Sequence, residues 1–179
     1  MLKINTETEY KCLVTHTEFQ RLLKIYKDDS IKIKQTNIYY CDQLNKINEL
    51  EAMLRNRLYS NSNTLTFKVW QDSELLEFEM DDVDISNELF LDALAKYDVF
   101  PPFEEVAEML TIRRLIDLPE AQLCLDENHY CGATDYEIEF ELKEKGDYLN
   151  IFIDILAQVS ITYEPNPLSK YQRAIKAAT

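Results

Sequence analysis

Glycine is scarce in this chain, with only two among 179 residues. The loops that hold phosphates in dinucleotide-binding and P-loop proteins need several glycines at fixed spacing, and neither pattern occurs here. If the protein binds phosphate, side chains have to supply most of the contacts.

Long apolar runs and paired cysteines are also missing. No stretch of 18 apolar residues occurs, and there is no apolar leader-like segment near the start. The four cysteines (Cys12, Cys41, Cys124 and Cys131) show no C-x-x-C spacing. We therefore expect a cytoplasmic protein with reduced thiols and no membrane partner.

Positive charge is the third shortage, because 19 basic residues face 33 acidic ones and give a net charge of −14. Such a surface repels polyanions, so we expect no nucleic-acid partner. Recruitment of divalent cations stays open beside the ordinary explanation, solubility. The length and the 46% hydrophobic content predict one packed domain over residues 1–179. Monomer and homodimer both remain possible.

Acidic residues alternate with apolar ones in three segments. In "NTETEYKCLV", Glu7, Glu9 and Lys11 share one face if the segment is a strand. The segments "LLEFEM" and "DYEIEFEL" repeat the E-x-E pattern. Their acidic positions are Glu77, Glu79, Asp135, Glu137, Glu139 and Glu141. Any one segment is weak evidence, since half-exposed strands routinely alternate in this way.

Basic residues follow the same spacing in other segments. Arg55 and Arg57 share a face, Lys68 lies on the polar side of "TLTFKVW", and Arg113 and Arg114 lie within "LTIRRLIDL".

The whole pattern predicts an α+β fold with about eight antiparallel strands that close into a barrel. The first strand is expected at 4–14. Helices are expected at 15–28, 43–53, 86–97, 103–109, 147–159 and 167–178, with a capping box at Thr15 and Glu18 and an N-cap at Ser86. If the helices cover the apolar faces outside, the charged faces point inward, where charges must be paired, solvated or awaiting a ligand. Carboxylates beside Arg and Lys suit a polyphosphate bound with Mg²⁺ or Mn²⁺.

These segments resemble the CYTH domain, the triphosphate tunnel metalloenzyme fold named for class IV adenylate cyclase and thiamine triphosphatase. "ETEYK" is similar to the E-x-E-x-K signature that opens the domain. The likeness continues in order through "QTNIYYCD", "LRNRL", "TLTFKV", "LLEFE", "TIRR", "LCLDENHYCGATDYEIEFE" and "LSKYQR". The last two segments are most similar to stand-alone bacterial CYTH proteins of the Firmicute type.

The resemblance implies a tunnel of eight antiparallel strands with charged residues inside. It assigns divalent metal to Glu7, Glu9, Glu137 and Glu139, and with less definite roles Glu77 and Glu79. It assigns the phosphates of the substrate to Lys11, Arg55, Arg57, Lys68, Arg113 and Lys170. One departure concerns the K-x-R pattern of the sixth strand, because Thr111 stands in the first position. Arg114, Lys170 or Arg173 are the alternatives for that contact.

The function expected from this resemblance is metal-dependent hydrolysis of a small triphosphate: inorganic triphosphate, thiamine triphosphate or a nucleoside triphosphate. Glu139 or Glu9 would act as general base, with Lys11 beside them. Two alternatives stay open, cyclisation of ATP to cAMP and a non-catalytic module that binds nucleotide or polyphosphate.

Overall fold

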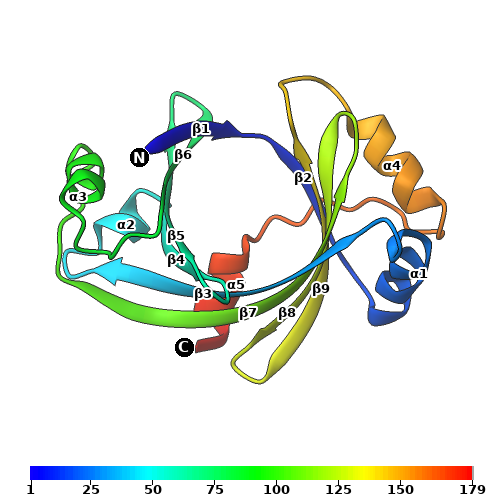
Figure 1. The fold of residues 1–179 in the computed structure, drawn as a ribbon, viewed down its shortest axis with the longest axis horizontal. Helices are drawn as coiled ribbons and strands as arrows, with labels where there is room; N and C mark the ends of the chain where they lie inside the picture. The colour runs from blue at the N-terminus through cyan, green and yellow to red at the C-terminus, as the bar shows by residue number, and fades with distance from the viewer. Residues whose placement is uncertain (179) are drawn as a thin grey trace. The chain divides into compact units, whose positions relative to one another are not determined.

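A computed structural model describes residues 1–178, in which there are nine β-strands and five α-helices. In chain order they are β1 (Lys3–Glu7), β2 (Glu9–Val14), α1 (His16–Tyr26), β3 (Ile31–Asp42), α2 (Lys46–Glu49), β4 (Met53–Leu58), β5 (Asn63–Gln71), β6 (Glu74–Asp81), α3 (Glu88–Ala95), β7 (Phe103–Asp117), β8 (Ala121–Tyr130), β9 (Ala133–Leu142), α4 (Leu149–Ala157) and α5 (Lys170–Ala178) (Figure 1). The predicted α+β class is confirmed, with one strand more than expected.

The additional strand arises because the segment expected as one strand is divided at Thr8. β1 pairs with β6, whereas β2 pairs with β9. Neighbouring strands follow the order β1-β6-β5-β4-β3-β7-β8-β9-β2, and the registers of the paired strands are antiparallel. The first and last strands in this order are therefore consecutive in the sequence.

The chain forms two compact units. Unit 1 contains Met1–Glu7, Gln35–Met109 and the chain from Lys170 onward, and unit 2 contains Thr8–Lys34 and Leu110–Ser169. Strands β3 and β7 contribute residues to both units, because the divisions fall at Gln35 and Leu110.

The core of unit 1 lies on one face of β4, β5 and β6. Leu54, Phe67 and Phe78 of these strands pack with Ile47 of α2 and Phe90 of α3, and α2 and α3 lie on the same side of the strands in Figure 1. Alternation along each strand then leaves the charged residues on the opposite face, as the sequence predicted.

The core of unit 2 lies on one face of β2, β8 and β9. Phe140 and Leu123 pack with Phe19 of α1 and Phe152 of α4. The predicted capping box begins α1: the amide of Glu18 donates to Oγ1 of Thr15 over 3.3 Å, and the amide of Thr15 donates to the Glu18 carboxylate over 2.7 Å. The polar residues of these strands again occupy the other face.

A two-residue turn joins β8 to β9. Cys131 and Gly132 both have positive φ, 46° and 77°, as a type I′ turn requires. Tyr130 and Ala133 pair across the turn, and this register places Asp126 opposite Glu137. The turn therefore sets which polar residues meet between the two strands.

Two local predictions were wrong. The segment 103–109 is the first part of β7, not a helix, because its backbone pairs within the sheet and this overrides local propensity. The N-cap of α3 is Asn87, whose Oδ1 accepts from the amide of Phe90 over 3.2 Å, whereas the Ser86 hydroxyl and amide donate to Asp84.

No helix within residues 1–178 combines the length and the apolar character that crossing a bilayer requires.

Phe152→Ala should destabilise the protein by about 3–5 kcal/mol, because Phe152 is fully buried and its ring lies 5.5 Å from that of Phe140 and 6.4 Å from that of Tyr10. Ile153, the next residue on α4, is 37% exposed, so Ile153→Ala should cost about 1 kcal/mol or less. Urea unfolding of both variants measures the difference. Equal losses would contradict this description of the core.

Candidate active site

The polar face of unit 2 is built by the registers of β2, β9, β8 and β7. Lys11 of β2 lies opposite Glu139 of β9, and Glu9 lies opposite Glu141. On the other side, Asp126 of β8 pairs with Arg113 of β7. Because residues directly opposite each other in antiparallel strands point to the same face, these charges all meet on one surface.

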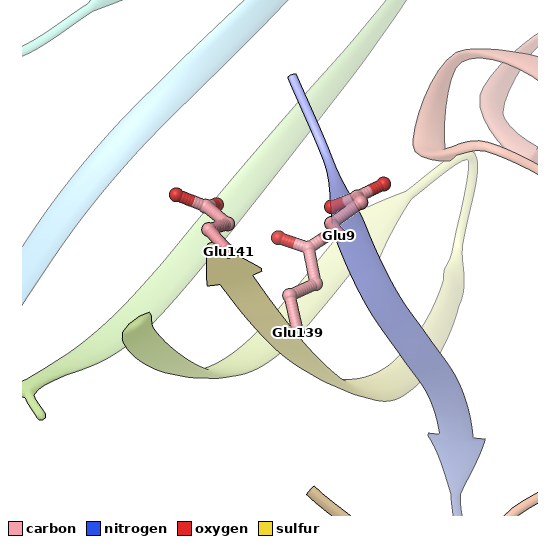
Figure 2. A group of neighbouring side chains, drawn as sticks. All are labelled: Glu9, Glu139 and Glu141. Atoms are coloured by element: carbon pink, nitrogen blue, oxygen red, sulfur yellow. The ribbon is translucent and has the colours of Figure 1, made fainter. Parts of the chain in front are cut away.

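Three carboxylates converge on this face. Figure 2 shows Glu9 of β2 beside Glu139 and Glu141 of β9, and one oxygen of each lies within 4.8 Å of the others. A cluster of carboxylate oxygens is the donor set that Mg²⁺ and Mn²⁺ prefer. The residues therefore fit the divalent metal that the resemblance implies, although Glu141 was not among the metal ligands expected from the sequence.

Lys11 lies beside these carboxylates and contacts Glu9 directly. Burial alone would lower the pKa of Lys11, but the negative charges of Glu9, Glu139 and Glu137 outweigh it and raise the pKa. Lys11 therefore keeps its positive charge on this face.

Arg113 is bonded to three carboxylates. Its Nε donates to Asp126 over 2.8 Å, and one Nη donates to Asp126 and Glu139 over 2.7 and 2.6 Å. The other Nη donates to Glu141 over 3.0 Å. Burial would lower the pKa of Arg113, but Asp126 and the other negative groups beside it raise the pKa well above its usual value.

Glu137 is fully buried on the same face. Its carboxylate accepts from the side-chain amide of Asn166 over 2.9 Å, and the backbone amide of Asn166 donates to the carbonyl of Lys11 over 3.1 Å. Asn166 lies between α4 and α5, outside any periodic segment, so no pattern in the sequence indicates it.

Thr111 occupies the position where the family often has lysine. It is fully buried, and its hydroxyl donates to Oδ1 of Asn128 over 2.8 Å. Asn128 in turn donates to Asp135 over 2.9 Å, and the hydroxyl of Tyr130 donates to Asp135 over 2.6 Å. The uncharged side chain of Thr111, bonded through Asn128 to Asp135, thus stands where the resemblance implies a cation, while Arg114 lies on the other face of β7 by alternation.

The formal charges on the face of unit 2 do not balance. The side chains described above comprise the carboxylates of Glu9, Asp126, Asp135, Glu137, Glu139 and Glu141 and the cations of Lys11 and Arg113. Among these named side chains, six negative charges outnumber two positive ones, and a divalent cation would reduce the difference.

Unit 1 carries a second charged face, on β1, β4, β5 and β6. Lys68 contacts Glu7, and its Nζ lies 3.1 Å from Oε1 of Glu77. Arg55 donates to Oγ1 of Thr66 over 3.1 Å, and Thr66 donates to Glu79 over 3.4 Å. These contacts place five charged residues on one face, Glu7, Arg55, Lys68, Glu77 and Glu79, with Thr66 between Arg55 and Glu79.

Three arginines and a lysine act electrostatically on Tyr39 in unit 1. Burial raises the pKa of Tyr39, and the positive charges of Arg55, Lys170, Arg57 and Arg173 oppose the rise. Arg57 also donates through Nε to Oδ1 of Asn37 over 3.0 Å. The C-terminal helix α5 therefore brings Lys170 and Arg173 within electrostatic range of the same tyrosine as the R-x-R pair of β4.

The buried Nε of Arg55 has no hydrogen-bond partner among residues 1–178. Burial and the like charge of Arg57 lower the pKa of Arg55. Burial and mutual repulsion thus disfavour the two neighbouring guanidiniums, and an anion bound beside them would compensate their charge.

The structure places the expected site residues in two groups. Unit 1 holds Glu7, Arg55, Arg57, Lys68, Glu77, Glu79 and Lys170, and unit 2 holds Glu9, Lys11, Arg113, Glu137 and Glu139. Sequence reasoning did not identify Asp126 and Asn166, and it placed Glu141 among the acidic strand positions without assigning it to the metal. The positions of Asp126 and Glu141 could have been predicted, since alternation places each on the polar face of its strand.

The protein is of the α+β class: its antiparallel strands pack helices against their apolar faces and carry carboxylates on the other face. Comparison with known proteins gives the family. The family model described as "CYTH domain" matches residues 5–174. The chain belongs to the CYTH family.

Solved structures resemble the chain over nearly its whole length. A candidate adenylate cyclase from Bacillus halodurans is 28% identical, with a TM-score of 0.82 over 95% of this chain and 97% of that one. A candidate adenylyl cyclase from Hippeastrum, described as having a dominant triphosphatase activity, is 19% identical with a TM-score of 0.76 over 92% and 93%. A protein from Pyrococcus horikoshii is 18% identical with a TM-score of 0.64 over 93% and 97%. The last two show the fold alone. No curated protein matches the sequence.

Stability should depend on pH through Glu79. Burial and the neighbouring charge of Glu77 raise the pKa of Glu79 above its usual value of 4.5. The folded state therefore holds this proton more tightly than the unfolded state does. The associated stability is present below pH 4.5 and is lost as pH rises through the higher pKa of the folded state.

The Glu79→Gln variant mimics the protonated form, so it should not lose this stability as the pH rises. The free energy of unfolding of the variant relative to wild type should rise between pH 4 and pH 8, as measured by urea unfolding at each pH. Glu74→Gln, at the start of β6 and exposed, is the control. A difference between variant and wild type that does not change with pH would contradict the raised pKa.

Proposed function

We propose that this protein hydrolyses a small triphosphate with the help of a divalent metal ion. The observation that carries the proposal is the group of three carboxylates, Glu9, Glu139 and Glu141, set beside the two cations Lys11 and Arg113. Membership in the CYTH family supports it, as does the resemblance of "ETEYK" to the E-x-E-x-K signature of the family.

Glu9, Glu139 and Glu141 would hold Mg²⁺ or Mn²⁺, with the buried carboxylate of Glu137 close to Lys11 on the same face. Bound metal supplies positive charge that offsets the negative charge of the phosphoryl oxygens during transfer. Glu7, Glu77 and Glu79 stay in the predicted metal-binding set, and in unit 1 Glu7 and Glu77 lie against Lys68.

Basic side chains would bind the phosphates. Arg55, Arg57, Lys68 and Lys170 in unit 1 and Lys11 in unit 2 are the proposed contacts. Guanidiniums offer two parallel N–H groups to phosphate oxygens, which fixes the orientation of the phosphates as well as their charge. The resemblance also predicts a phosphate contact for Arg113, whose side chain is bonded to three carboxylates.

A carboxylate has to take the proton of the attacking water. Glu139 and Glu9 are the two candidates, because each lies in the three-carboxylate group, where Glu139 contacts Arg113 and Glu9 contacts Lys11. Hydrolysis breaks the bond between the terminal phosphorus and its bridging oxygen and releases orthophosphate.

Cyclisation of ATP is the second candidate function. It is favoured by the 28% identity to a protein from Bacillus halodurans named as a candidate adenylate cyclase. The two reactions share binding groups and differ in the nucleophile, so their products separate them: cAMP with pyrophosphate, or orthophosphate. A cytoplasmic location and the absence of nucleic-acid partners stay predictions from composition.

Wild-type protein should release orthophosphate from at least one of inorganic triphosphate, thiamine triphosphate and ATP, in a reaction that requires Mg²⁺ or Mn²⁺. Glu139→Gln should lower kcat by about 100-fold or more, because it removes a metal ligand and a candidate base. A phosphate-release assay measures both. Glu127→Gln is the matched control, since Glu127 lies on β8 against His129 and faces away from the carboxylate group.

Three results would overturn the proposal in different ways. Formation of cAMP and pyrophosphate would identify a cyclase. Metal-dependent binding of the triphosphates without turnover would identify a binding module. Equal turnover by Glu139→Gln and Glu127→Gln would exclude the three-carboxylate group as the site.

A further inference from the structure

We infer that Trp70 is a specificity-determining residue whose indole stacks on the planar ring of an organic triphosphate. The inference rests on the proposed function and narrows its substrate class to triphosphates that carry such a ring, a nucleoside triphosphate or thiamine triphosphate, in preference to inorganic triphosphate. Trp70 is the single tryptophan of the chain, and no E-x-E or R-x-R pattern indicates it.

Trp70 lies on the polar face of unit 1. Its chain neighbour Val69 is buried in the core, so alternation along β5 turns Trp70 to the opposite face, which carries Lys68. Trp70 pairs with Leu75 of β6, and Leu75 pairs in turn with Glu7 of β1. Because residues directly opposite each other point to the same face, these three side chains form one row across three strands.

This row lies next to a cation that the proposed function uses for the phosphates. Lys68 precedes Trp70 by two residues, contacts Glu7 and lies 3.1 Å from Oε1 of Glu77. Two residues of a strand span about 7 Å. In nucleoside and thiamine triphosphates, a sugar or a two-carbon chain separates the ring from the first phosphate by a distance of the same order. A substrate with a phosphate at Lys68 would therefore bring its ring to Trp70.

The indole of Trp70 is available for stacking. Trp70 is 55% exposed, whereas Phe67 and Phe78, on the other face of β5 and β6, are buried and pack with Tyr97. A large apolar ring left in water forgoes the stabilisation that burial would give. A flat ring laid on the indole removes this surface from water, and a cationic ring gains an additional cation–π attraction.

A β-strand holds Trp70 in place. β5 ends one residue later, and a two-residue turn leads into β6 through Asp72 and Ser73, whose φ angles of 50° and 68° are both positive. Groups on strands are positioned more precisely than groups on loops. Lys68 lies further from the turn than Trp70, so the phosphates would lie further along the strands and the ring nearer to their end.

A purely structural role for Trp70 predicts different behaviour. An indole opposite Leu75 also stabilises the hairpin of β5 and β6. Loss of that contact would affect the binding of all triphosphates alike, whereas loss of a stacking partner affects only ligands that carry a ring. Inorganic triphosphate is therefore the control ligand.

The fluorescence of Trp70 tests the inference in unaltered protein, because no other tryptophan contributes. On rapid mixing with Mg²⁺ and either ATP or thiamine triphosphate, before turnover, stacking should quench the indole and shield it from acrylamide. Inorganic triphosphate with Mg²⁺ should leave the emission and its quenching by acrylamide nearly unchanged. Equal responses to all three triphosphates, or no response to both ATP and thiamine triphosphate, would overturn the inference.

Steady-state kinetics of variants gives an independent test. Trp70→Ala should raise KM for ATP or thiamine triphosphate by about 10-fold with little change in kcat, and should leave KM for inorganic triphosphate within about twofold. Trp70→Phe keeps a flat ring and should restore most of the loss. Phe100→Ala removes another exposed aromatic ring, outside the strands, and is the control. An equal rise of KM for inorganic triphosphate in Trp70→Ala would show a structural role and contradict the inference.

The two organic substrates and the two kinds of failure can be told apart. The triphosphate whose KM rises more in Trp70→Ala identifies the ring that Trp70 accepts. If wild type neither binds nor hydrolyses any of the three triphosphates, the proposed function is wrong and the inference falls with it. If wild type hydrolyses inorganic triphosphate but neither ATP nor thiamine triphosphate alters its fluorescence, the inference alone is wrong. This comparison holds even where Trp70→Ala fails to fold.

Discussion

The pairing of Arg113 with Asp126 governs the polar face of unit 2. Six carboxylates share that face, and buried charges of one sign are tolerated only when cations and hydrogen bonds compensate them. Arg113 contacts three of them at once, and Lys11 contacts a fourth. The remaining negative charge would attract a divalent ion. Lys11 and Arg113 reduce the repulsion among the carboxylates, which would otherwise destabilise the folded state.

Each unit reaches such a face by the same route. Alternation along the strands sends apolar residues toward the helices, α2 and α3 in unit 1 and α1 and α4 in unit 2, and charged residues to the other side. Because glycine is almost absent, backbone amides cannot form the anion-binding loops found in many phosphate-binding proteins. In the proposed function, side chains such as Arg55 and Arg57 would carry that role instead, although their like charges repel each other.

Much of the fold could be predicted from the sequence, because local patterns specify it. The period of two in "DYEIEFEL" specifies which residues share a face, and the capping box at Thr15 specifies where α1 begins. Pairing partners are not encoded locally. The division at Thr8 depends on β1 and β2 pairing with different strands, and the helix expected at 103–109 is a strand because the sheet extends through it.

In the candidate site, too, residues that follow from the pattern of one segment could be predicted, whereas contacts between segments could not. Glu9, Lys11 and Glu139 follow from alternation and from the family signature. The convergence of Glu141 with them depends on the register between β2 and β9, which no single segment contains. Asn166 is still harder to anticipate, because it reaches Glu137 from an irregular segment.

The turn between β8 and β9 has a practical consequence. Cys131 is exposed at its tip, whereas Cys12 and Cys124 are buried, and burial raises the pKa of the Cys12 thiol to about 12. Cys41 is half-buried beside Tyr171 and Asn48. Thiol reagents react with accessible thiolates, so Cys131 offers a natural attachment point for a spectroscopic label. A spin label there would sit at the end of the hairpin that carries Asp126 and Glu139, so its magnetic coupling to paramagnetic Mn²⁺ could be measured without any engineered cysteine.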